Sequence, residues 1–80
     1  MANIMIVDDE IDILDLIEVY LQNAGHTAIK YNHPSQALDH DLSDIDLAVL
    51  DVMMPDIDGF SLCRQLREKG YTFPIIMLTA

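Results

Sequence analysis

The stretch LAVLDVMMPDIDG occupies residues 47–59 and decides the fold. Its first four residues are apolar, as in a buried strand, and they lead directly into Asp51. Pro55 then turns the chain, and Asp58 followed by Gly59 is typical of the start of a helix. A buried strand that ends on a carboxylate just before a sharp bend suggests a functional role for that carboxylate.

Length and composition narrow the class of protein. The chain has 80 residues, which is one domain at most, and its formal net charge is -10. Such an acidic segment is not expected to contact nucleic acid, whose phosphates need a basic surface, or an anionic membrane surface. The one cysteine, Cys63, excludes an internal disulfide. No apolar run approaches the roughly 20 residues that span a bilayer, so we expect a cytoplasmic protein without a membrane segment.

Strand and helix patterns alternate along the chain. Apolar runs predict strands at residues 4–7, 26–31, 46–50 and 74–79. Helical spacing of apolar residues predicts helices at residues 11–24 and 34–42, and a third from about residue 59 up to Gly70. The order βαβαβαβ implies an α/β fold with a parallel sheet and right-handed crossovers. Strand 26–31 is the most polar, so we expect it at a sheet edge.

Acidic residues stand where two of these strands end. Asp8 and Asp9 follow the first strand, and Asp51 follows the third. Ligands of an open α/β sheet bind beyond the carboxyl ends of its strands, so neighbouring first and third strands would bring the three carboxylates into one crevice. Two carboxylates about 4 Å apart repel by roughly 4 kcal/mol at an effective dielectric near 20, so the cluster protonates or recruits a cation. Carboxylate oxygens suit Mg²⁺, and a carboxylate beside Mg²⁺ can attack phosphorus.

Three motifs together resemble a known family. They are IMIVDDE at residues 4–10, LAVLDVMMPDIDG at 47–59 and PIIMLTA at 74–80. In order and spacing they resemble the receiver domain of bacterial two-component response regulators, over essentially the whole chain. The resemblance implies a CheY/flavodoxin-like, doubly wound parallel sheet with strand order 2-1-3-4. The family's fifth strand and last two helices have no counterpart in these 80 residues, so residues 1–80 are expected to be the N-terminal part of a receiver domain.

The resemblance implies roles for four residues of the acidic motifs. Asp51 matches the phosphoacceptor. Asp9 and Asp51 match direct ligands of Mg²⁺, Asp8 matches a carboxylate that acts through water, and Met53 would supply its main-chain carbonyl. The implied partner is a sensor histidine kinase, with acetyl phosphate as a small alternative donor. Such a domain catalyses only its own phosphorylation and dephosphorylation, so we do not expect an enzyme that acts on other substrates.

The last motif carries two further implied roles and a departure from the family. Thr79 matches the hydroxyl that moves towards the phosphoryl group, and Ala80 matches a small residue whose amide contacts it. The family's essential lysine, at the end of its fifth strand, has no counterpart here. Neither Lys30 nor Lys69 is expected to replace it. We therefore expect Mg²⁺ binding to survive better than phosphorylation in this chain.

The apolar strand 74–79 would lack an outer neighbour in this chain. An exposed apolar edge is a template for pairing with another chain. We therefore expect self-association, by edge pairing, by exchanged elements or by a partner's helix covering the bare sheet face.

Parts of the sequence also fit other functions or plainer roles for single residues. Residues 56–59 echo the DxDG motif of haloacid-dehalogenase-type phosphatases, but that motif should directly follow an apolar strand. An EF-hand fails because Met54 and Gln65 would occupy acidic loop positions. The main alternative is an assembly or kinase-docking module that keeps the acidic pocket without being phosphorylated. Among plainer roles, Asp9 alone suits a helix N-cap, and Thr79 suits a strand. Asp56 is expected in a turn, and the three histidines, His26, His33 and His40, are expected to be solvated.

Overall fold

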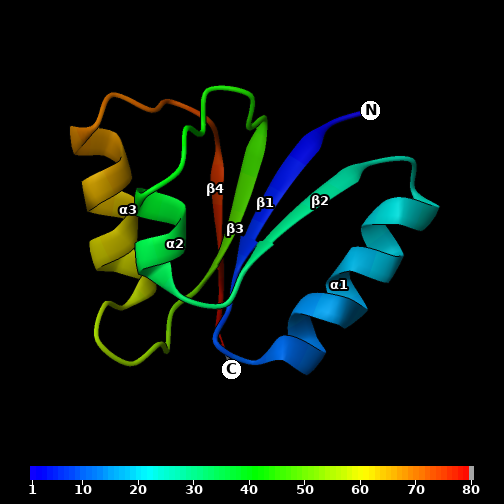
Figure 1. Ribbon diagram of the computed structural model, residues 1–80, viewed down its shortest axis with the longest axis horizontal. Helices are drawn as coiled ribbons and strands as arrows, with labels where there is room; N and C mark the ends of the chain where they lie inside the picture. Colours follow the sequence, from blue (N-terminus) through cyan, green and yellow to red (C-terminus); the bar gives the residue numbers. More distant parts are fainter. Residues whose placement is uncertain (80) are drawn as a thin grey trace.

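The computed structural model describes residues 1–79, which form a four-stranded sheet with helices on both faces (Figure 1). The strands are β1 (Asn3–Val7), β2 (Thr27–Tyr31), β3 (Leu47–Asp51) and β4 (Ile75–Leu78), and the helices are α1 (Ile11–Asn23), α2 (Pro34–Leu38) and α3 (Gly59–Glu68). All strand pairs are parallel, in the order β2-β1-β3-β4. The predicted order 2-1-3-4 is confirmed, with the polar strand β2 at an edge.

The two faces of the sheet are buried to different extents. Met5, Val7 and Leu50 are fully buried on the face that α2 and α3 cover (Figure 1), where they belong to one apolar core. The helices contribute Ala37, Leu62 and Leu66 to that core, all with no exposed surface. Helix α1 covers part of the opposite face, where it packs against β2 and buries Leu14. Strand β1 is therefore buried on both sides, as its continuous apolar run predicts, whereas in β3 only the alternate residues that face α2 and α3 are buried.

Helix α2 ends four residues earlier than predicted, at Leu38. The chain leaves the helix so that Leu42 can enter the core, where only 1% of its surface is exposed. The backbone N–H of Leu42 then donates to the Tyr71 hydroxyl, at 3.1 Å, instead of to a helical carbonyl. Burial of one leucine thus overrides the local helical pattern.

Strands β3 and β4 also differ from their predicted bounds. Strand β3 includes Asp51, whereas Asp46 precedes the strand and accepts the backbone N–H of Asn3 through its side chain, at 2.7 Å. Strand β4 ends at Leu78, so Thr79 follows the strand and does not belong to it. Among residues 1–79, no helix has the length and apolarity needed to cross a membrane.

Candidate functional site

Three carboxylates meet at the carboxyl ends of two neighbouring strands. Asp8 and Asp9 directly follow β1, and Asp51 is the last residue of β3, which pairs with β1. Each of the three offers a carboxylate oxygen that lies within 4.8 Å of the other two. The structure therefore brings together the three acidic residues that the sequence pattern placed at strand ends.

Asp8 is the buried member of this acidic cluster, with 5% of its surface exposed. Its Oδ1 accepts the backbone N–H of Glu10, at 2.9 Å. Burial raises the pKa of Asp8 above its ordinary value, and the charges of Asp51, Asp9 and Glu10 add to this rise, while the hydrogen bond from Glu10 opposes it. The cluster thus favours a bound proton or a bound cation over a bare set of charges.

Asp51 is half-buried, and its carboxylate is oriented by the backbone that follows it. Its Oδ1 accepts the N–H of Met53, at 3.1 Å. The strand continues its pairing for one more residue, because the N–H of Val52 donates to the carbonyl of Leu78. The carbonyl of Val52 in turn accepts the N–H of Gly59, at 3.1 Å, which joins the start of α3 to the end of β3.

The acidic cluster borders an open hollow of about 300 Å³. Its walls include Asp8, Asp51, Met53 and Thr79, together with Glu10, Ile13 and Leu78. Thr79 is exposed and therefore accessible at the same hollow as Asp51. Met53 is 74% exposed, and its contact with Asp51 is made by its backbone N–H. Ala80 lies outside the described residues.

Both lysines are engaged away from the acidic cluster. The Nζ of Lys30 lies 2.9 Å from both Asp15 and Glu18 on α1. The Nζ of Lys69 donates to the carbonyl of Leu38 at the end of α2, at 2.7 Å. Neither therefore supplies positive charge to the acidic cluster.

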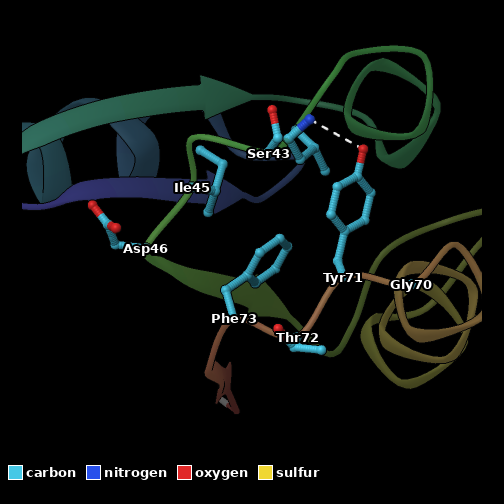
Figure 2. A pocket seen from close by; sticks show the side chains of 8 residues that line it. Ser43, Ile45, Asp46, Gly70, Tyr71, Thr72 and Phe73 are labelled. Atoms are coloured by element: carbon cyan, nitrogen blue, oxygen red, sulfur yellow. Dashed lines mark hydrogen bonds between the residues drawn. The ribbon is translucent and has the colours of Figure 1, made fainter.

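A second hollow lies at the opposite end of the sheet (Figure 2). It has a volume of about 290 Å³. The residues that line it include Tyr71, Phe73, Asp46 and Ser43. The Tyr71 hydroxyl accepts a hydrogen bond from the backbone N–H of Leu42, which is the dashed line in Figure 2. Because ligand sites of parallel sheets lie beyond the carboxyl ends of the strands, the hollow beside Asp8 and Asp51 is the better candidate.

The sequence did not reveal two contacts near the site. Asp56, expected in a turn, has a φ of 61°, in the left-handed region. Its Oδ2 lies 2.9 Å from the Nε2 of His33, so His33 is not simply a solvated histidine. In addition, the space beside Gly59 is filled by the backbone of Asp51. No local pattern signals contacts between residues so far apart in the chain.

The donor set fits a divalent cation. The three side chains of the acidic cluster offer only oxygen atoms, which are the ligands that Mg²⁺ prefers. Burial is the main cause of the raised pKa of Asp8, and a cation between the three carboxylates would offset the repulsion that adds to it.

Comparisons with known proteins agree with this geometry. A profile of the response regulator receiver domain family matches residues 4–80. Regulatory protein VanR of Enterococcus faecium is 51% identical over 77 residues, covering 95% of this chain and 33% of that protein. The chain thus spans about a third of the length of this curated relative.

Solved structures give the same result for the fold. The response regulator protein TrrA of Thermotoga maritima, in complex with Mg(2+)-BeF, has a TM-score of 0.90 and 36% identity, over 100% of this chain and 70% of that chain. The structure of the histidine kinase ThkA in complex with the same TrrA has a TM-score of 0.89 and 36% identity, with the same coverage.

Proposed function

The chain belongs to the family of response regulator receiver domains, and from this premise we propose that it accepts a phosphoryl group on Asp51 in a Mg²⁺-dependent reaction. The proposed donor is the phosphohistidine of a sensor histidine kinase, by analogy with the complex of ThkA and TrrA. We further propose that residues 1–80 are the N-terminal part of a receiver domain, with the catalytic role confined to the domain's own phosphorylation and dephosphorylation.

The observation that carries the proposal is that three carboxylates meet where strands β1 and β3 end. Asp8 and Asp51 both line the hollow, but Asp8 is buried and Asp51 is half-buried, whereas Asp9 is exposed. The N–H of Met53 holds one carboxylate oxygen of Asp51, which fixes the direction of the side chain. Asp51 is thus the residue that can meet an incoming phosphoryl group.

The proposed step is a displacement at phosphorus. A carboxylate oxygen of Asp51 attacks the phosphorus atom while its bond to the histidine nitrogen, or to the acetate oxygen of acetyl phosphate, breaks. The leaving group takes the electron pair of the broken bond, and an acyl phosphate remains on Asp51. The carboxylates of Asp8, Asp9 and Asp51, with the Met53 carbonyl, would hold Mg²⁺, which when bound neutralises negative charge in this reaction. The Thr79 hydroxyl lies at the same hollow and can donate to a phosphoryl oxygen.

Phosphorylation should be slow in this 80-residue chain. Phosphoryl transfer depends on positioning and on neutralising charge. Lys30 and Lys69 are held by Asp15, Glu18 and the carbonyl of Leu38, so neither supports the phosphoryl group. Mg²⁺ binding requires only oxygen ligands and should be better preserved than phosphorylation.

A phosphate-affinity gel tests the function. The wild type and Asp51→Asn are incubated with acetyl phosphate, with and without Mg²⁺. A slow shift of the wild type that requires Mg²⁺ and is lost in Asp51→Asn supports the proposal. A shift that persists in Asp51→Asn overturns Asp51 as the acceptor. Complete labelling of the wild type within minutes overturns the prediction that phosphorylation is slow.

The alternative is an assembly module that is not phosphorylated. The edge of β4 favours it, because β4 pairs only with β3 within residues 1–79, and 50% of Ile76 is exposed there. We infer that a second copy of this chain pairs along this edge, whatever the outcome at Asp51. An absent shift in both the wild type and Asp51→Asn, together with a stable dimer, would favour assembly as the function.

A further inference from the structure

The side chain of His33 joins the loop that follows β2 to the loop that follows β3. His33 lies between β2 and α2, and Asp56 lies between β3 and α3. The Nε2 of His33 is 2.9 Å from the Oδ2 of Asp56, across 23 residues of sequence. Because β1 lies between β2 and β3, this contact links the loops on either side of the strand that leads into Asp8.

The contacts of His33 define which ring nitrogen donates. Its Nδ1 accepts the backbone N–H of Ser35, at 3.1 Å, and so caps the N-terminus of α2. An amide N–H can only donate, so Nδ1 carries no proton in this arrangement. The proton of a neutral ring is then on Nε2, which donates to the carboxylate of Asp56. Both nitrogens of His33 are therefore used, one for α2 and one for the β3–α3 loop.

Asp56 occupies a sensitive place in that loop. Its φ of 61° is uncommon for a residue with a side chain and requires support from its surroundings. The loop begins at Met53, whose N–H orients the carboxylate of Asp51, and ends at Asp58, which caps α3. A contact that restrains Asp56 thus restrains the segment that orients Asp51.

We propose that His33 is a positioning residue for the acidic cluster. It holds the loop of residues 53–58 through Asp56, and the loop in turn holds Asp51 through Met53. The link to cation binding rests on the proposed function, whereas the link to the loop does not. In the absence of the His33 contact, the loop opens more often and the acidic cluster is less well prepared for a cation.

Two variants break the contact while keeping the local backbone intact. His33→Ser retains a side chain that caps α2 but cannot reach Asp56. Asp56→Gly removes the carboxylate yet tolerates the positive φ. Asp56→Asn is the conservative control, because it keeps an acceptor oxygen and tolerates this backbone conformation. His40→Ser is the matched histidine control, since His40 contacts the carbonyl of Gln36 and not the loop.

The first measurement is amide hydrogen exchange, resolved by residue with NMR. We expect His33→Ser and Asp56→Gly each to speed exchange at Met53 and Ile57 by about two- to five-fold, the range for the loss of one exposed hydrogen bond. The double variant should be no faster than either single variant, because the contact is lost once. Asp56→Asn and His40→Ser should match the wild type. Unchanged loop amides in both single variants, or additive effects in the double, would overturn the proposal.

The second measurement is Mg²⁺ affinity by isothermal titration calorimetry. Both single variants should bind Mg²⁺ about two- to five-fold more weakly, with rescue in Asp56→Asn. Faster loop exchange with unchanged Mg²⁺ affinity would overturn the positioning role. A wild type that does not bind Mg²⁺ would overturn the proposed metal site instead, and the exchange data would still decide whether His33 anchors the loop.

Discussion

A Cβ atom on Gly59 would collide with the backbone carbonyl oxygen of Asp51. It would also lie 3.0 Å from the carbonyl carbon of Asp51 and from the Cα of Val52. The first residue of α3 therefore packs directly on the backbone of the proposed phosphoacceptor. This close approach explains why the helix that follows Asp58 begins with a residue that has no side chain.

Gly59→Ala should lower both the stability of the fold and the affinity of the acidic cluster for Mg²⁺. The added methyl group meets backbone atoms, which cannot move aside as a flexible side chain would, so α3 or the end of β3 must shift. We expect the free energy of unfolding to fall by about 1–3 kcal/mol, as for overpacked cores. Because the shift reaches Asp51, Mg²⁺ affinity should fall as well. Urea denaturation and calorimetric titration measure the two effects.

Gly70→Ala provides the control for Gly59→Ala. The space beside Gly70 is open, but its φ of +95° strains any other residue. This variant should lose about 1 kcal/mol of stability and keep the Mg²⁺ affinity of the wild type. An equal loss of affinity in both variants would show that the effect at Gly59 is general destabilisation.

Asp8→Asn should change how stability depends on pH when metal is absent. Burial raises the pKa of Asp8 in the folded state above its ordinary value of 3.8. The folded state therefore holds more protons between these two values, and the free energy of unfolding falls as pH rises through that window. Asparagine has a similar shape and no charge, so the stability of Asp8→Asn relative to the wild type should increase over the same window.

Urea denaturation in a chelator, from pH about 4 to about 8, measures the effect at Asp8. A constant difference between the wild type and Asp8→Asn would contradict the raised pKa. Added Mg²⁺ should stabilise the wild type more than Asp8→Asn, because at a given ligand concentration the stabilisation of the folded state rises with the logarithm of the affinity.

Asp58→Ala should weaken α3 with the opposite dependence on pH. The Oδ1 of Asp58 accepts the N–H of Ser61, at 2.7 Å, and this bond lowers the pKa of Asp58. Such a group stabilises the fold above its unfolded pKa, and that contribution is lost as pH falls through the lower folded value. Thermal unfolding by circular dichroism should show a lower melting temperature at neutral pH and a smaller difference in acid. Asp58→Ser retains a capping oxygen and should melt close to the wild type.

Ile76→Lys should separate the copies of a dimer. Ile76 is 50% exposed on β4, one of the two outer strands of the described sheet, and a lysine there discourages strand pairing. Light scattering at micromolar concentration should report a dimer for the wild type and a monomer for Ile76→Lys. Val19→Lys on α1 is the matched control, because Val19 is similarly exposed, at 53%, but lies away from the strand edge. A monomeric wild type would refute the assembly proposal.

Local patterns were sufficient for the order of the elements and for part of the site. Apolar runs that end on acidic residues located β1 and β3, since the residues of a buried strand and its end are adjacent in sequence. The same patterns misplaced the end of α2, because the burial of Leu42 and its bond to Tyr71 depend on distant parts of the chain. The neighbouring position of β1 and β3 came from family resemblance and not from periodicity.

The sequence by itself determined which residue types end each strand, and therefore which carboxylates were available for a metal. Only the tertiary structure decided that Asp8 would be the buried one, that Gly59 would lie against Asp51 and that His33 would reach Asp56. The physical reason is one of range. Periodicity and capping act over a few residues, whereas burial and contacts between loops arise only when the sheet brings distant segments together.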